Sequence, residues 1–282
     1  MDRFVNANGI RLHCIDHSGG EPPVVLLPGL TANANSFDGL VGIGLAPRYR
    51  VLAIDLRGRG QSDKPDTGYS MADHAADIIG LLDALDIERP VVGGHSFGGM
   101  LAMYIASRFP DRLRKLIILD SAAGLISAET REMIKPSLGR LGKTFASWQQ
   151  YIDVIKKAPF FDGWWEPAVE SYYRADVVTG DDGNVTPRSR YENIAEAMDR
   201  SMEVSWNQVA ATITCPALLL RAPEGMGGKG SAPLLSLELA RATVDAISGC
   251  KYSEVSGNHM TMLYGQGARQ IVDEIMKFVD AG

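Results

Sequence analysis

Short, continuously apolar runs recur along the first and last parts of the chain, separated by longer amphipathic stretches. Residues 24–27, 51–54 and 116–119 are apolar throughout, and each run ends at a proline or an aspartate, as buried strands often do. A strand without a polar face is covered on both sides, as the strands of parallel sheets are. Residues 10–15, 90–92, 217–220 and 251–255 are also predicted to be strands. The pattern predicts an α/β fold with a mostly parallel central sheet and right-handed crossovers.

Three stretches have the periodicity of helices. Residues 71–85 follow Ser70, with Asp73 three positions further on, a combination that caps the first turn of a helix. Residues 100–109 follow a glycine pair and stop before a proline, and a last amphipathic stretch spans residues 270–279. Alternation of strands and helices is the pattern of an α/β domain.

The pattern changes at about residue 122. From there to about residue 206 the segments are helical or irregular, without a convincing ladder of strands, and all four tryptophans fall among them. Residues 180–184, with the sequence Gly-Asp-Asp-Gly-Asn, predict a turn. We therefore expect one α/β core domain formed by residues 1–121 and 208–282, interrupted by a helical cap, or lid, over residues 122–207.

Composition excludes several classes of function. The chain is 45% apolar and 22% charged, and its net charge of −6 offers no basic surface for nucleic acid or an anionic membrane. No stretch approaches the ~18 consecutive apolar residues of a membrane span, and the N-terminus lacks the apolar segment of a signal peptide. A cytoplasmic location is the default expectation. The cysteines have no metal-binding spacing, and no metal or organic cofactor is expected (Cys14, Cys215 and Cys250).

The chemistry is expected at Ser96. Residues 94–98 read Gly-His-Ser-Phe-Gly and stand between an apolar run and a helical stretch. A sharp strand-to-helix turn at such a serine strains its backbone, and the flanking glycines relieve the crowding and expose the hydroxyl above the sheet. A glycine-rich turn without chemistry is the alternative. The context favours a nucleophile.

A serine hydroxyl needs a base that takes its proton. His259 lies in a loop after the last predicted strand, which brings it to the same edge of the sheet as Ser96. His13 and His17 flank an early strand, and His74 lies on a helix. His95 neighbours the serine but is expected to point away from the tip of the turn. We therefore predict His259 as the base, with a buried structural histidine as the alternative.

Two carboxylates are candidates for the group that orients this imidazole. Glu224 follows the strand before the last, and Asp120 ends the strand one crossover earlier; both satisfy the chain order serine, acid, histidine. We prefer Glu224, because the strand before the last carries the acid more often. Asp120 is the alternative, and is otherwise expected to bond a loop backbone. Asp55 also ends a strand and is expected to brace the turn after it.

An oxyanion hole requires two fixed donors where negative charge develops. The backbone N–H of Phe97, directly after the nucleophile, is the first predicted donor. The second is the N–H of Leu30, in the tight loop after residues 24–27.

Four segments together resemble the α/β-hydrolase superfamily, and the similarity covers nearly the whole chain. They are residues 26–29 (Leu-Leu-Pro-Gly), 55–62 (Asp-Leu-Arg-Gly-Arg-Gly-Gln-Ser), 94–99 (Gly-His-Ser-Phe-Gly-Gly) and 257–259 (Gly-Asn-His). Pro28 stands where the family usually has a histidine, which is expected to change the support of the oxyanion loop rather than its donors. Residues 222–225, Ala-Pro-Glu-Gly, replace the usual Gly-x-x-Asp of the acid loop.

The resemblance implies a serine hydrolase that cleaves carboxylic esters or lactones through an acyl-enzyme. Serine at position 96 argues against haloalkane dehalogenases and epoxide hydrolases, which use an aspartate. The alternatives that keep serine are lactonases specific for acyl-homoserine or enol-lactones, and carbon–carbon bond hydrolases. A ligand-binding protein without turnover is the alternative from a different class.

The expected partner is a small-molecule ester or lactone, held in an apolar pocket under the cap. The aromatic side chains of residues 122–207 are expected either to line that pocket or to form the core of the cap itself. The oligomeric state is left open.

Overall fold

An eight-stranded sheet forms the centre of the protein, and a computed structural model describes residues 1–162, 164–227 and 230–281. The strand order is β1-β2-β4-β3-β5-β6-β9-β10. β1 pairs with β2 and β2 with β4 in antiparallel orientation, and every other neighbouring pair is parallel. The strands are β1 (Asp2–Ala7), β2 (Ile10–His17), β3 (Val24–Leu27), β4 (Val51–Ile54), β5 (Val91–His95), β6 (Lys115–Leu119), β9 (Ala217–Arg221) and β10 (Lys251–Glu254). The predicted α/β fold with a mostly parallel sheet is confirmed.

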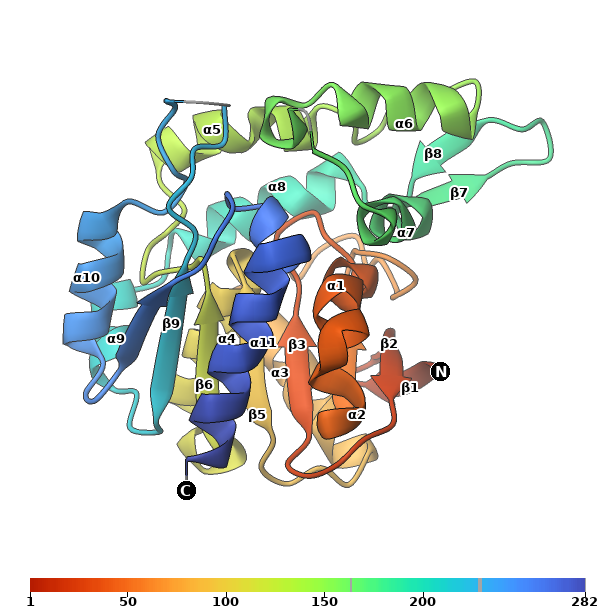
Figure 1. Cartoon of the computed structure of the whole chain (residues 1–282). Helices are drawn as coiled ribbons and strands as arrows, with labels where there is room; N and C mark the ends of the chain where they lie inside the picture. The colour runs from red at the N-terminus through yellow and green to blue at the C-terminus, as the bar shows by residue number, and fades with distance from the viewer. Residues whose placement is uncertain (163, 228–229, 282) are drawn as a thin grey trace.

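Helices cover both faces of this sheet (Figure 1). One face carries α1 (Asp38–Leu40), α2 (Ala46–Arg48) and α11 (Gly265–Asp280), and the other carries α3 (Met71–Ala84), α4 (Phe97–Arg108), α9 (Trp206–Ala211) and α10 (Leu237–Ala246). Along β3, Val25 and Leu27 belong to one buried apolar cluster, and Val24 and Leu26 to the other. Burial on both faces is the physical reason that this strand is apolar throughout.

The predicted cap of one helix is confirmed, whereas one strand of the sheet was not predicted. Ser70 and Asp73 form the predicted cap of α3, because each backbone N–H donates to the side chain of the other at 3.0–3.1 Å. β1, however, has no counterpart among the predicted strands. It is an edge strand whose side chains are mostly exposed, so it lacks the apolar run that marks the inner strands.

The elements of residues 122–207 lie beyond the edge of the sheet at which the parallel strands end (Figure 1). They are α5 (Ala128–Leu138), α6 (Trp148–Lys156), α7 (Pro167–Asp176), β7 (Val177–Thr179), β8 (Val185–Pro187) and α8 (Tyr191–Ser201). The predicted turn at residues 180–184 joins β7 to β8, where the Gly180 N–H donates to the Asn184 carbonyl at 2.8 Å. A two-stranded hairpin thus stands in a segment for which no strands were expected.

Short turns of 3-10 or π type complete the chain, at Ala34–Phe37, Val41–Leu45, Pro110–Arg112, Pro159–Phe161 and Thr261–Leu263. Within the described ranges, no helix combines the length and the apolar character that crossing a membrane requires.

Glycines bring the backbones of β3, β5 and α4 into close contact. A methyl group at Gly98 would lie 2.0 Å from the carbonyl oxygen of Leu27, and one at Gly94 would lie 2.0 Å from the carbonyl oxygen of Gly98. Both obstacles are backbone atoms, which no side-chain rotation removes. The first turn of α4 therefore depends on the absence of side chains at these two positions.

Replacing Gly98 by alanine is expected to lower the free energy of unfolding by about 1–3 kcal/mol, the usual cost of overpacking. Gly139 provides the control, because a methyl group there would meet its nearest neighbour at 3.6 Å and its φ is −62°. Urea unfolding of Gly98→Ala and Gly139→Ala measures the difference. Equal stabilities of the two variants would contradict the predicted clash.

Candidate active site

Ser96 occupies a strained turn between β5 and α4. Its φ and ψ are 55° and −120°, a region that residues with a side chain rarely adopt. Two bonds hold the turn: the Ser96 N–H donates to the Leu119 carbonyl at 3.0 Å, and the Ser96 carbonyl accepts from the Ser121 hydroxyl at 2.6 Å. The local geometry matches the strand-to-helix turn that the sequence predicts for a nucleophile.

His259 is paired with Asp120. The Nδ1 atom of His259, in the loop between β10 and α11, lies 2.6 Å from Oδ2 of Asp120. Asp120 directly follows β6, is fully buried, and uses its other carboxylate oxygen to accept the N–H of Ala222 at 2.8 Å. The contact fixes the plane of the imidazole and leaves its Nε2 atom on the opposite side of the ring, as in a base oriented by a carboxylate.

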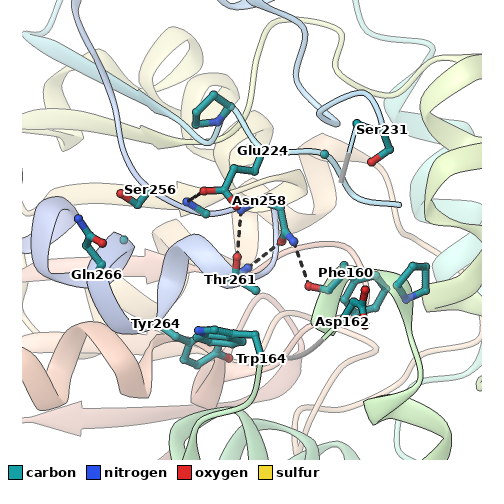
Figure 2. Close-up of a pocket in the computed structure, with 16 residues that line it drawn as sticks. Phe160, Asp162, Trp164, Glu224, Ser231, Ser256, Asn258, Thr261, Tyr264 and Gln266 are labelled. Atoms are coloured by element: carbon teal, nitrogen blue, oxygen red, sulfur yellow. Dashed lines mark hydrogen bonds between the residues drawn. The ribbon is translucent and has the colours of Figure 1, made fainter. Parts of the chain in front are cut away.

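The preference for Glu224 as the orienting acid is wrong. Glu224 is exposed, and its side chain accepts the N–H of Gly257 at 3.1 Å while its own N–H donates to the Gly257 carbonyl at 3.2 Å (Figure 2). Glu224 therefore stabilises the loop that carries His259 from its exposed side, and no hydrogen bond among the described residues joins it to the imidazole. The alternative, Asp120, makes both contacts expected of it, one with a loop backbone and one with the histidine.

His95 faces the site, contrary to the expectation that it points away. Its ring centroid lies 4.4 Å from that of His259, and its Nε2–H donates to the His259 carbonyl at 2.8 Å. Burial holds the pKa of His95 well below its usual range, so the ring is neutral at pH 7. A methyl group at Gly29 would meet the His95 ring at 3.4 Å and Cβ of Ser96 at 3.5 Å. These contacts bring Ser96, His259 and the loop after β3 together.

The two predicted oxyanion donors lie on adjoining segments. Phe97 begins α4, and backbone N–H groups of a first helical turn have no acceptor within the helix. Leu30 belongs to the turn that the Ala32 N–H closes by donating to the Gly29 carbonyl at 3.0 Å. Phe97 directly follows Ser96, and Leu30 follows Gly29, which lies beside Ser96, so the arrangement is consistent with the two predicted donors.

Arg59 holds both of these segments, and sequence reasoning missed it. Its Nε donates to the Leu30 carbonyl at 3.0 Å, its guanidinium lies 5.2 Å from the centre of the Phe97 ring, and its Nη1 lies 3.0 Å from Nε2 of His74. Burial lowers the pKa of Arg59 to about 9, which leaves it charged at neutral pH. It occupies a variable position of the 55–62 motif, and it supports the loop in which Pro28 replaces the usual histidine.

Asp55 braces its turn as expected. Its carboxylate accepts the N–H of Ala34 at 2.7 Å and that of Gln61 at 2.8 Å, and it contacts Nδ1 of His13 at 2.7 Å. The turn that follows the oxyanion loop and the 55–62 motif are therefore joined through one buried side chain.

A small cavity of about 60 Å³ adjoins the triad. Its walls come from the core, with Leu30, His95 and His259 among them, and from residues 122–207. The lining residues that belong to residues 122–207 are Ile134, Ser137, Leu138 and Tyr172. Ser96 lies directly beside the lining residues Gly29 and His95.

Most aromatic side chains of residues 122–207 pack on one another instead of lining this cavity. The ring of Phe161 contacts those of Trp165 and Tyr173 at 5.2 and 6.0 Å, and the ring of Tyr151 contacts that of Tyr173 at 6.2 Å. Tyr172 is the aromatic residue of this segment that reaches the cavity. The aromatics therefore form mainly the segment's own core.

A larger hollow, of about 740 Å³, is lined by other residues of the histidine loop, with Ser256, Asn258 and Thr261 among them (Figure 2). Asn258 lines it and ties that loop to residues 122–207, because its side-chain amide donates to the Phe160 carbonyl at 2.9 Å. Neither Ser96 nor His259 lines this hollow. We therefore place the chemistry at the smaller cavity. Across the described ranges, no cluster of three or more His, Cys, Asp or Glu side chains could hold a metal ion.

Comparison with known proteins identifies the family of the chain. A family model described as the alpha/beta hydrolase fold matches residues 22–210. Over 120 residues, 43% of this chain and 42% of the relative, the sequence is 35% identical to 2-(acetamidomethylene)succinate hydrolase of Mesorhizobium japonicum. It is 36% identical over 162 residues, 55% of this chain and 54% of the relative, to 2-hydroxymuconate semialdehyde hydrolase of a Pseudomonas species.

Solved structures match over the whole chain. A crystal structure of E-2-(acetamidomethylene)succinate hydrolase superposes with a TM-score of 0.85 at 24% identity, covering 100% of this chain and 99% of that one. The enol-lactonase of Burkholderia xenovorans gives 0.72 at 20% identity, covering 98% and 99%. By sequence, the chain spans about a third to a half of the length of the curated relatives it matches.

Replacing Asp120 by asparagine is expected to lower kcat by about 10⁴-fold, because the amide favours the wrong tautomer of the imidazole while the geometry persists. Glu224→Gln is the matched control: the amide oxygen still accepts the Gly257 N–H, and kcat should stay close to that of the wild type. Both variants are assayed with an activated ester after circular dichroism has shown that they are folded. A collapse of kcat in Glu224→Gln alone would restore Glu224 as the acid.

Proposed function

Since the chain belongs to the α/β-hydrolase family, we propose that it is a serine hydrolase that cleaves small carboxylic esters or lactones. The observation that carries the proposal is the pair of His259 and Asp120 beside the strained turn of Ser96, with 2.6 Å between Nδ1 and Oδ2. A buried carboxylate that orients an imidazole next to a serine is the arrangement that activates a hydroxyl.

The reaction proceeds in two steps. The Ser96 oxygen attacks the substrate carbonyl while His259 accepts its proton, and the oxyanion that forms is stabilised by the N–H groups of Leu30 and Phe97. His259 returns the proton to the leaving alcohol, which in a lactone remains attached to the acyl group. Water then attacks the acyl-enzyme with His259 as the base, and the carboxylic acid leaves as Ser96 regains its proton.

Names of related proteins support hydrolysis but differ in substrate. Both relatives compared above are called hydrolases, and a structural neighbour is called an enol-lactonase. Hydrolysis of a carbon–carbon bond would use the same residues, so a vinylogous diketone belongs among the substrates to be assayed. We prefer an ester or lactone because the triad supplies all that its hydrolysis requires.

Residues 122–207 are proposed to act as a lid. They close the cavity with Ile134, Leu138 and Tyr172, and the cavity is far smaller than the ~300–1,000 Å³ of typical ligand sites. Two bonds tie this segment to the oxyanion loop: Arg140 donates to the Thr31 carbonyl and Asn33 to the Tyr172 carbonyl, both at 3.1 Å. Entry of substrate therefore requires movement of this segment.

Ser96→Ala is expected to abolish labelling by a fluorophosphonate and to lower kcat by about 10⁴-fold or more, because no acyl-enzyme can form. The wild type should show a burst of para-nitrophenol with para-nitrophenyl esters, and the panel adds acyl-homoserine lactones and a vinylogous diketone. Turnover of Ser96→Ala equal to that of the wild type, or a wild type that resists labelling, would contradict the proposal. Turnover of the diketone without that of esters would favour the carbon–carbon hydrolase.

A further inference from the structure

The described lining of the cavity beside His259 is poor in charged side chains. Its described lining contains neither lysine nor arginine nor a carboxylate, and its ionisable side chains are two histidines and two tyrosines. Of the histidines, His95 is neutral, because burial holds its pKa well below the usual range. Burial raises the pKa of both tyrosines, Tyr172 and Tyr264, so they stay uncharged. Apart from the proposed base His259, a substrate therefore meets a wall without charge.

Arg140 contacts two residues of this wall, Ser137 and Thr31, and all three nitrogens of its guanidinium group are engaged within the protein. It donates to Asp176 from Nε at 2.8 Å and from Nη2 at 3.2 Å, and to the carbonyl groups of Ser137 and Thr31. The hydroxyl of Tyr151 donates to the same Asp176 carboxylate at 2.5 Å. Both members of the ion pair are buried. The positive charge of Arg140 is thus compensated within the protein.

Two further buried charges, Asp120 and Arg59, lie near the cavity, and neither side chain lines it. Asp120 lies directly behind His259 and is fully buried. Arg59 is fully buried outside the cavity lining, where it contacts the Leu30 carbonyl and the Phe97 ring. A carboxylate bound in this cavity would lose its hydration without gaining a paired cation, which is strongly unfavourable.

Ser36 is the exception in this wall, because it has a polar atom without a partner. It is 3% exposed, it lines the cavity, and none of the described residues bonds its hydroxyl oxygen. The residue stands in the turn Ala34–Phe37 that follows the oxyanion loop. A buried hydroxyl without a partner costs stability, and a bound ligand that supplies the missing hydrogen bond would recover it.

We propose that this cavity selects an uncharged ester or lactone and that the Ser36 hydroxyl hydrogen-bonds a neutral oxygen of that substrate. The inference rests on the proposed function, and it adds the charge of the substrate and one contact that determines specificity. It excludes substrates whose acyl part carries a free carboxylate.

A pair of esters tests the charge. The para-nitrophenyl ester of adipic acid and that of its monomethyl ester differ at the far end by one charge and a methyl group. The neutral ester should have the higher kcat/KM by about 100-fold or more, after correction for the hydroxide rates. Equal values, a preference for the acid, or no turnover of the neutral ester by protein that still reacts with fluorophosphonate would overturn the proposal. Failure of the labelling itself would instead count against the proposed function.

A cation placed in the wall tests the same point from the protein side. Ser137→Lys puts an ammonium on a half-buried position of α5 that lines the cavity, and should raise the kcat/KM of the acid relative to the neutral ester by about tenfold. Glu132→Lys, on the same helix but exposed and outside the lining, is the control and should leave the ratio unchanged. The same ratio in both variants would contradict a selection that depends on charge in the cavity.

Ser36→Ala tests the hydroxyl contact. The variant should be at least as stable as the wild type, because it removes a buried atom without a partner, yet its kcat/KM for the methyl adipate ester should fall by about 3- to 10-fold. The value for para-nitrophenyl octanoate, which lacks the distal oxygen atoms, should not change. If the ratio of the two kcat/KM values does not change, even when both values fall, the Ser36 contact is overturned.

Ser201→Ala is the matched control for this variant. Its hydroxyl is also buried but donates to the Met198 carbonyl at 2.7 Å, so alanine there should lower Tm without changing the ratio of the two esters. A loss of Tm in Ser36→Ala as large as that in Ser201→Ala would show that Ser36 is bonded within the protein, which would overturn its assignment to the substrate.

Discussion

The strained backbone of Ser96 is the constraint on which the site depends. A φ of 55° persists in a residue with a side chain only where the surroundings leave no alternative. Here the Ser96 N–H continues the pairing of β5 with β6, and glycines at 94 and 98 let α4 begin against β3. The register of the central strands therefore fixes where the hydroxyl stands. The fold supplies this position before any other group of the site is placed.

The remaining groups reach Ser96 because parallel strands end at one edge of the sheet. Asp120 follows β6 and holds two partners at once, the Ala222 N–H and His259, so a single carboxylate links the loops after β6, β9 and β10. Arg59 has a comparable role on the other side, where it contacts Leu30 and Phe97. The proposed catalytic groups are thus positioned by buried polar side chains that have no proposed contact with the substrate. Such support is what preorganised catalysis requires.

Chain order and burial can be predicted from the sequence, whereas the direction of a side chain in a loop cannot. Strands covered on both faces leave an apolar run, and a strand, a glycine-flanked serine and a late histidine are enough to place Ser96 and His259. The choice between Glu224 and Asp120 depends on where the loop after β9 runs, and that path takes Glu224 outside the histidine loop. His95 and Arg59 stand inside recognised motifs, yet only tertiary packing turns them toward the site. The edge strand β1 was not predicted for the opposite reason, since its exposed side chains leave no apolar run.

Arg140 connects the proposed lid to the loop that carries the proposed oxyanion donor Leu30. It belongs to the segment proposed as a lid, it is neutralised there by Asp176, and it donates to the Thr31 carbonyl, next to the proposed donor at Leu30. Opening the lid for substrate would break this bond and loosen the loop that carries the donor. Closing it would restore the loop and expel water from a cavity that has no charge to retain it. Because the arginine is compensated before substrate arrives, it adds order to the loop without adding an attraction for anions. Closure, donor placement and the preference for a neutral substrate then depend on the same buried ion pair.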